Sequence, residues 1–78
     1  MKTSIIRVYN NRYNEWASGV RVCLQFTDFA SMGFTKEVNT DANGNAYIDH
    51  NGSGNANIFA NGDKVGNLYA PDSVTVHI

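Results

Sequence analysis

The stretch TDANGNAYID (Thr40 to Asp49) carries oxygen-bearing side chains at alternate positions from Asp41 onward, as calcium-binding loops do. An EF-hand loop also needs a glycine at its sixth position and a bidentate glutamate at its twelfth. Counted from Asp41, these positions hold Ala46 and Gly52. We therefore interpret the stretch as a tight turn between two strands. In this turn Asn43-Gly44 supplies residues that tolerate positive φ, and Asp41 accepts backbone N–H bonds.

The side chains that could act as nucleophile and base are Cys23, His50 and His77. Catalysis would require such groups to converge in a pocket, with the base oriented by a third group. Cys23 lies on the polar side of an alternating segment, without a glycine-rich turn or a helix start that would activate its thiol. We interpret both histidines as surface residues. The sequence therefore predicts no catalytic residues and no enzyme.

Metal ligands are also sparse. Structural zinc requires four Cys or His ligands, usually in close pairs, and the chain has one cysteine and two separated histidines. The carboxylates Asp41, Asp49, Asp63 and Asp72 are scattered among expected turns. A weak calcium site between neighbouring loops is an open alternative to solvated turn residues. We predict no metal and no cofactor.

Aromatic and amide side chains gather in YNNRYNEWASG, residues 9–19. Sugar-binding surfaces use this combination, because an aromatic ring covers a pyranose face while amides bond its hydroxyls. One functional hypothesis is therefore carbohydrate binding through Tyr13, Trp16, Asn10, Asn11 and Asn14. The alternative is structural: Trp16 plugs one end of the domain, and Tyr13 covers a sheet edge.

A second loop, TDFASMGFTKE, contains the apolar residues Phe29, Met32 and Phe34 in no regular period. Either these side chains fold back to cap the core, or they form an exposed patch that contacts another protein. Gly33 provides the bend in both cases. Our first functional hypothesis is a non-enzymatic interaction module that binds another protein through loop 27–35 or through a sheet edge; the alternative partner is a glycan.

Strict period-two alternation of apolar and polar residues predicts β-strands along most of the chain. The pair Asn61-Gly62 is a strong hairpin signal. The polar segment 34–40, anchored by Val38, is expected to be a blunted edge strand. The first or last strand is the alternative edge that can pair with a neighbouring chain, so we expect a monomer or a weak edge-strand dimer. We predict a single all-β domain over residues 1–78, a small antiparallel sandwich of immunoglobulin-like type with about seven strands. The expected strands are 4–10, 20–26, 34–40, 45–50, 56–60, 64–70 and 73–78.

Composition narrows the classes of partner. The chain has 78 residues, of which 42% are hydrophobic and 17% charged, with a net charge of −1 and no cluster of Lys or Arg. Duplex nucleic acid and anionic membranes would normally require a basic patch, so we expect neither as a partner. The start, MKTSIIRVYNN, lacks the apolar core of a signal peptide. We therefore expect a cytoplasmic protein, unless the chain is an excised or mature domain.

The order of these segments resembles the transthyretin-like (prealbumin-like) β-sandwich family, which includes carboxypeptidase regulatory-like domains. The matching residues are Gly19-Val20-Arg21-Val22, the turn Thr40-Asp41-Asn43-Gly44-Ala46, and Ala60-Asn61-Gly62. The resemblance spans nearly the whole chain, although the family pattern does not supply the TDFASMGFTKE insert. It implies an accessory, binding or spacer module. The histidine and arginine motifs of transthyretin-like hydrolases have no match here.

Overall fold

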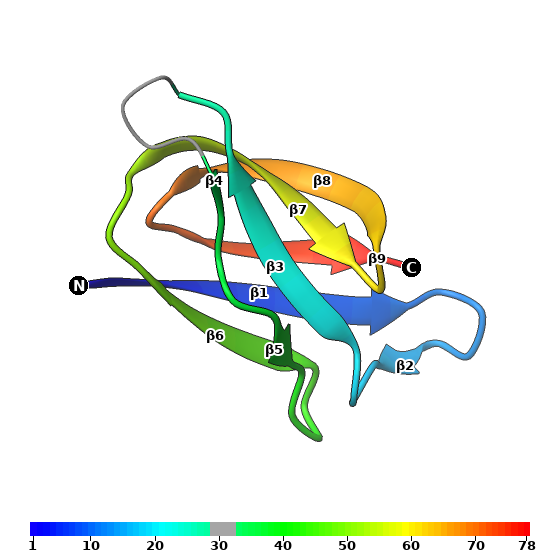
Figure 1. Cartoon of the computed structure of the whole chain (residues 1–78). Coiled ribbons are helices and arrows are strands. Elements are labelled where there is room, and N and C mark those ends of the chain that lie inside the picture. The colour runs from blue at the N-terminus through cyan, green and yellow to red at the C-terminus, as the bar shows by residue number, and fades with distance from the viewer. Residues whose placement is uncertain (29–32) are drawn as a thin grey trace.

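The computed structural model describes residues 1–28 and 33–78, which form β-strands and no helix. Two sheets pack face to face, and Figure 1 shows β3 of one sheet crossing in front of β1 of the other. No helix in the described ranges is long and apolar enough to cross a membrane. The strands are β1 (Lys2–Asn10), β2 (Glu15–Trp16), β3 (Arg21–Phe26), β4 (Gly33–Phe34), β5 (Val38–Asn39), β6 (Asn45–His50), β7 (Gly54–Ala60), β8 (Asp63–Ala70) and β9 (Ser73–His77).

The first sheet, which we call the β1 sheet, is built on both sides of β1. Strands β6 and β2 pair with β1 in antiparallel orientation. On the other side β9 runs parallel to β1, from Ile5↔Ser73 to Tyr9↔His77. The predicted all-β sandwich is therefore confirmed, but this sheet is mixed, where the sequence predicted antiparallel strands throughout.

The second sheet, the β3 sheet, is antiparallel: β7 pairs with β3, and β8 pairs with β7. The predicted edge strand 34–40 is broken, because only the two-residue strands β4 and β5 pair with β3. Between them, the Thr35 N–H donates to the Leu24 carbonyl, and the Thr35 hydroxyl accepts the Leu24 N–H, both at 2.9 Å. The polar segment is thus an interrupted edge, which is a poor template for pairing with another strand.

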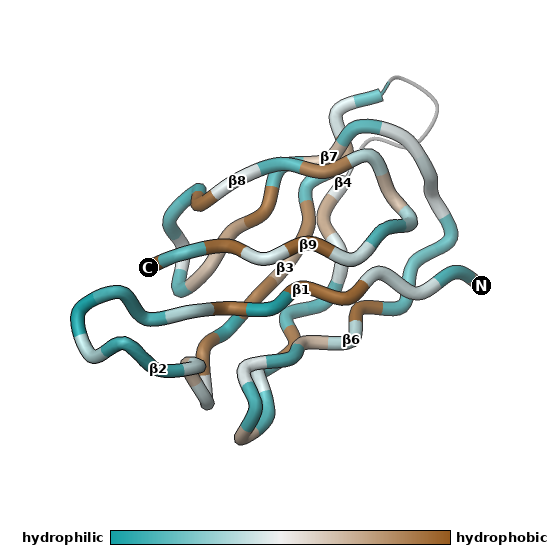
Figure 2. The backbone as a smooth tube through the Cα atoms, turned by 180° about the vertical axis from the view of Figure 1, so that it is seen from behind, coloured by the Kyte–Doolittle hydropathy of each residue, from teal (hydrophilic) through white to brown (hydrophobic). Residues whose placement is uncertain are grey.

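Alternation places the core between the sheets. Hydrophobic and hydrophilic residues alternate along β1, β3 and β9 in Figure 2. Of the residues that alternation predicts to face the core, Val38 and Val74 are half-buried, and Ile78 is 39% exposed because it lies beyond the end of β9; the others are buried. The large apolar side chains that are fully buried are Ile6, Leu24, Ile48, Ile58, Val8 and Val22.

Two turns confirm the sequence interpretation. The Asp41 carboxylate accepts the N–H groups of Asn43 and Asn45, at 2.9 and 3.0 Å. Asn61 and Gly62 have φ values of 50° and 89° and join the paired residues Ala60 and Asp63 of β7 and β8. This is the geometry that an Asn-Gly hairpin turn requires.

The first of these turns also packs against the β1 sheet. Gly44 has a φ of 79°, and a Cβ atom added to it would lie 2.8 Å from the Val8 carbonyl oxygen and 3.1 Å from the Trp16 Cβ. Gly44 therefore serves two purposes: it adopts the left-handed conformation and lets the turn approach β1 and Trp16.

We expect Gly44→Ala to lower the free energy of unfolding by about 2–5 kcal/mol, the sum of left-handed strain and overpacking. Gly19→Ala is the matched control, since Gly19 has a φ of 69° but open space around it. Its expected cost is the strain alone, about 1–2 kcal/mol. Urea denaturation of the two variants measures both, and equal costs would contradict the close approach at Gly44.

Candidate functional site

An aromatic cluster lies on the outer face of the β1 sheet. The register places Tyr9 of β1 between Trp16 of β2 and His77 of β9. The ring centroids of Tyr9 and Trp16 are 5.1 Å apart, and those of Tyr9 and His77 are 5.8 Å apart. Trp16 is 37% exposed. The expectation that Trp16 plugs one end of the sandwich is therefore wrong: its ring lies outside the sheet, against the turn at Gly44.

Arg7 lies beside these rings. Its Cζ atom is 4.0 Å from the centre of the Trp16 ring, which is a close cation–π contact. Its Nε–H donates to the Asn45 Oδ1 atom at 3.1 Å. We call Arg7, Tyr9, Trp16, Asn45 and His77 the Trp16 cluster. Alternation along β1 puts Arg7 and Tyr9 on the face opposite to buried Ile6 and Val8, and the pairing with β2 and β6 determines what they contact.

The asparagine side chains between β1 and β2 mostly stabilise the conformation of that loop. The Asn10 Oδ1 atom accepts the backbone N–H groups of Arg12 and Tyr13, at 2.9 and 3.2 Å. Asn14 takes a left-handed φ of 52°. These contacts form the turn from β1 to β2, so Asn10 and Asn14 are explained by local structure.

Of the other residues predicted to bind carbohydrate, Asn11 joins the cluster. Its Oδ1 atom is 2.8 Å from the Nδ1 atom of His77. Tyr13 is 64% exposed, and the aromatic partner of Trp16 among the described residues is Tyr9. The Arg12 guanidinium lies 5.6 Å from the centre of the Tyr13 ring. The structure thus brings together two of the predicted residues, Trp16 and Asn11, and leaves Tyr13 in the loop.

A second candidate surface is the outer face of the β3 sheet. Phe34 is 65% exposed, and its ring centroid is 6.0 Å from that of half-buried Phe59. Phe29 and Met32, the other apolar residues of the predicted protein-binding loop, lie outside the described residues. Beside Phe34 is an open hollow of about 410 Å³, lined by Cys23, Phe34, Thr35, Glu37, Phe59 and Gly62.

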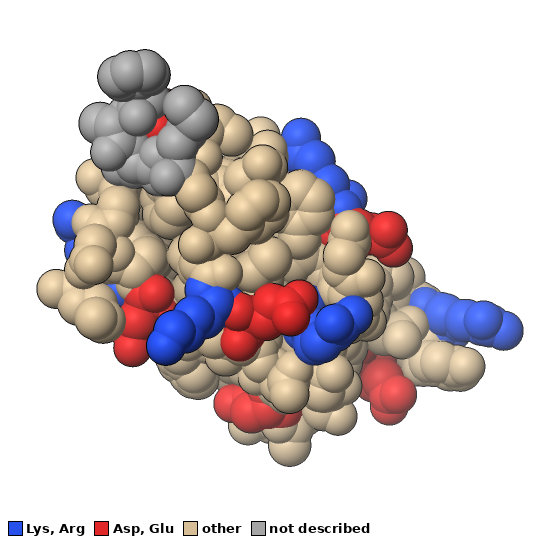
Figure 3. All heavy atoms as spheres, in the orientation of Figure 1, with Lys and Arg blue, Asp and Glu red and all other residues tan. Residues whose placement is uncertain are grey.

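Charged side chains lie on the same face as the hollow (Figure 3), and one of them, Glu37, lines it. Figure 3 shows Lys or Arg and Asp or Glu residues alternating in a band across this face, with an uncharged area above it. Arg21 and Glu37 lie 3.9 Å apart, and both side chains are exposed. An ion pair of this kind contributes little to stability, so the charges are available to a partner.

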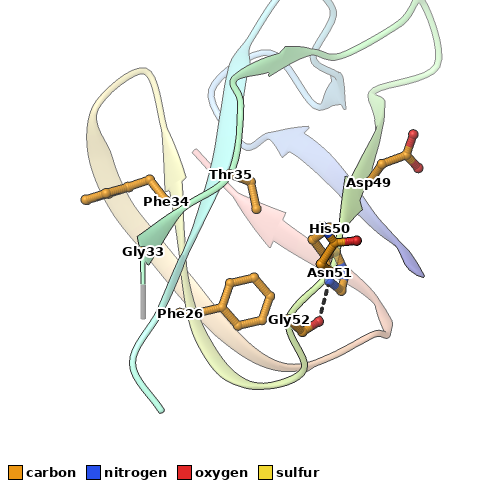
Figure 4. Close-up of a pocket in the computed structure, with 8 residues that line it drawn as sticks. All are labelled: Phe26, Gly33, Phe34, Thr35, Asp49, His50, Asn51 and Gly52. Atoms are coloured by element: carbon orange, nitrogen blue, oxygen red, sulfur yellow. Dashed lines mark hydrogen bonds between the residues drawn. The ribbon is translucent and has the colours of Figure 1, made fainter. Parts of the chain in front are cut away.

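A smaller hollow of about 190 Å³ lies between β4 and the end of β6. Figure 4 shows the Phe26 ring between β4 and the end of β6, while the side chains of Phe34 and Asp49 point away from the hollow. The centroids of the Phe26 and His50 rings are 5.2 Å apart. Both ring nitrogens of His50 are engaged within the protein, by Ser4 and by the Gly52 carbonyl, so we assign this hollow no ligand.

His50 is 6% exposed, so its interpretation as a surface residue is wrong. Its Nδ1 atom lies 2.7 Å from the Gly52 carbonyl oxygen, which can only accept, so Nδ1 carries a proton. In the neutral ring Nε2 then accepts the Ser4 hydroxyl, at 2.8 Å. The Ser4 oxygen in turn accepts the Asp72 N–H, at 3.3 Å. Ser4 is fully buried, where no substrate reaches it. We therefore interpret this series of hydrogen bonds as structural.

Cys23 is half-buried on the outer face of β3, as its alternation predicted. Burial raises the pKa of its thiol above the ordinary value, and the nearby Glu37 carboxylate raises that pKa further. Both causes disfavour the thiolate, which is the reactive form. Cys23 is therefore a slow nucleophile in the folded protein.

We expect Ser4→Ala to lower the free energy of unfolding by about 1–3 kcal/mol, because it leaves His50 Nε2 and the Asp72 N–H without a partner. Thr3→Ala removes a comparable hydroxyl, which donates to the Asp49 carboxylate at 2.7 Å but is exposed. Its expected effect is within about 0.5 kcal/mol. Urea denaturation compares the two variants, and equal losses would contradict a buried structural bond at Ser4.

Alkylation of Cys23 by iodoacetamide should follow a pH profile displaced to higher pH than that of the unfolded chain. Glu37→Gln should move the profile part of the way back to lower pH, because it removes the smaller of the two causes. Glu15→Gln, the same change in β2 of the other sheet, should leave the profile in place. Indistinguishable profiles for the two variants would show that Glu37 does not act on the thiol.

Comparisons with known proteins give no further guide: no family model, curated protein or solved structure matches the chain. Within residues 1–28 and 33–78, no three His, Cys, Asp or Glu side chains gather closely enough to hold a metal ion. The outer faces of the two sheets are therefore the candidate functional surfaces.

Proposed function

We propose that the chain is a non-enzymatic interaction module that binds another protein through the outer face of the β3 sheet. The observation that carries this proposal is the exposure of Phe34. A large aromatic ring that is 65% exposed, beside an open hollow, contributes little to folding. Aromatic side chains of this kind are enriched at the centres of protein interfaces.

The surroundings of Phe34 have the anatomy of such an interface. Phe34 and Phe59 form an apolar centre, and the hollow beside them is large enough to receive an apolar side chain of a partner. Arg21 and Glu37 form an exposed ion pair, and Glu37 also lines the hollow. A polar rim around an apolar centre orients a partner and excludes water.

The face supports binding better than the adjacent sheet edge does. Strand addition needs a continuous row of free backbone groups. The edge formed by β4 and β5 is interrupted at Thr35, whose N–H and hydroxyl are both bonded to Leu24. We therefore place the partner on the face of the sheet. The resemblance to transthyretin-like domains supports the same role, because those domains mostly serve as accessory modules.

We expect Phe34→Ser to abolish binding of a protein partner while shifting the thermal midpoint little, because the ring is mostly exposed. Tyr69→Ser is the matched control: Tyr69 is 69% exposed and lies on β8 of the same sheet. A protein that the wild type captures is then purified, and its binding to the wild type, to Tyr69→Ser and to Phe34→Ser is compared. In a direct titration it should protect Cys23, which lines the hollow, from alkylation.

Two results would contradict the proposal. Retention of the purified partner by Phe34→Ser would place the interface elsewhere. Unfolding of Phe34→Ser would show that the ring is part of the core, in contradiction to its 65% exposure in the structure.

Carbohydrate binding on the opposite face is a second candidate function. The observation that favours it is the Trp16 cluster, in which aromatic rings and amides lie together on the outer face of the β1 sheet. Such a surface offers apolar contact and hydrogen bonds to a sugar. Oligosaccharide titrations followed through the fluorescence of Trp16, the only tryptophan, test this candidate.

A further inference from the structure

We propose that the Trp16 cluster binds an acidic glycan, and that Arg7 recognises the carboxylate of its uronic acid units. This inference rests on the carbohydrate candidate for the class of ligand and is independent of the face around Phe34. It changes the role expected of Trp16, from a platform on which a sugar stacks to a support for a cation.

The first step is the position of Arg7 over Trp16. A sugar that stacked on the indole would need a free ring face. The Arg7 guanidinium lies over that ring, with Cζ 4.0 Å from its centre. Gly44 approaches the same side chain, since a Cβ on Gly44 would lie 3.3 Å from the Trp16 Cε3 atom. The indole is therefore largely engaged within the protein, and the group it presents to a ligand is the guanidinium.

The second step is the unused bonding capacity of Arg7. A guanidinium carries several N–H donors in a planar fork that matches a carboxylate. One of them, Nε–H, is bonded to Asn45. The ion pair found within the described residues, between Arg21 and Glu37, is on the other sheet and does not involve Arg7. Arg7 thus has a positive charge with no carboxylate beside it, and its terminal nitrogens make no hydrogen bond in residues 1–28 and 33–78.

The third step is preorganisation. Arg7 extends from the central strand of its sheet, its Nε is fixed by Asn45, and its plane is supported by Trp16. A side chain that is already ordered loses less conformational entropy when it binds. Arg7 as a residue is half-buried, and a charged hydrogen bond is stronger in such surroundings than in full contact with water.

The neighbours of Arg7 select a sugar acid over an acidic peptide. Thr75 of β9 is paired with Arg7 and is exposed. On β6, on the other side of β1, Tyr47 is paired with Ile5, two residues before Arg7, and is 53% exposed. The Thr75 hydroxyl and the exposed Tyr47 ring therefore flank the Arg7 cation. This arrangement suits a glycan, which is rich in hydroxyls and carries well-separated carboxylates. A densely acidic peptide would be disfavoured by a chain whose net charge is −1.

The test uses the full chain and an oligosaccharide of alternating glucuronic acid and N-acetylglucosamine, titrated to millimolar concentration. The matched ligand is the same oligosaccharide with its carboxyl groups reduced to alcohols. We expect a saturable change in Trp16 fluorescence with the acidic ligand, and affinity lower by about tenfold or more for the reduced one. Amide correlation NMR spectra then locate the shifts, which should centre on Arg7, Asn45 and Thr75.

Three variants identify the residue that binds the carboxylate. Arg7→Gln should abolish the response, and Arg7→Lys should weaken it, because lysine keeps the charge but not the planar fork. Arg21→Gln makes the same change of charge on the other sheet and should bind like the wild type. Dispersed β-sheet NMR spectra confirm that each variant is folded.

Each other outcome overturns the proposal in a recognisable way. Equal binding of the acidic and reduced ligands would leave carbohydrate binding in place but remove the role of the carboxylate. Equal losses in Arg7→Gln and Arg21→Gln would indicate nonspecific attraction to charge. A wild type that shows no saturable response to either ligand would reject both this inference and the carbohydrate candidate, while leaving the protein-binding proposal untouched.

Discussion

The double pairing of β1 is the constraint on which the arrangement of the domain depends. This strand exchanges backbone hydrogen bonds with β6 and β2 on one side and with β9 on the other, so segments from the start, middle and end of the chain meet along it. Its alternation sends Ile6 and Val8 into the core and Arg7 and Tyr9 outward. The same nine residues therefore hold one sheet together, fill part of the core and supply the centre of the Trp16 cluster.

The parts of this arrangement that could be predicted from sequence are those with a local cause. Period-two alternation gives the long strands and the side chains that face the core, and the Asn61-Gly62 pair gives the hairpin between β7 and β8. The turn at Asp41 is likewise local, since its carboxylate bonds N–H groups two and four residues ahead. Strands of two residues, such as β2 and β4, have no period to detect, and the parallel pairing of β9 with β1 joins residues far apart in the chain.

The candidate sites show the same division. His50 could have been placed in the core, because it shares its alternation with Ala46 and Ile48; its polar ring led to the opposite interpretation. Its partner Ser4 could not have been found, since their contact depends on the register between β1 and β6. Trp16 and Arg7 are separated by a loop, and only the pairing of β2 with β1 places the guanidinium over the ring.

A sandwich this thin limits the kind of binding site that it can offer. Its core is filled by side chains from two single sheets, and the hollows in the described part of the chain are open ones at the surface. Recognition must then occur on the outer faces, where alternation leaves every second residue free of packing constraints. The two faces use that freedom differently: one presents an apolar centre around Phe34 beside an ion pair, and the other presents a cation supported by aromatic rings. The outer faces of the two sheets lie on opposite sides of the sandwich, so a partner bound to one face leaves the other face accessible. The two proposed activities therefore do not compete for the same surface.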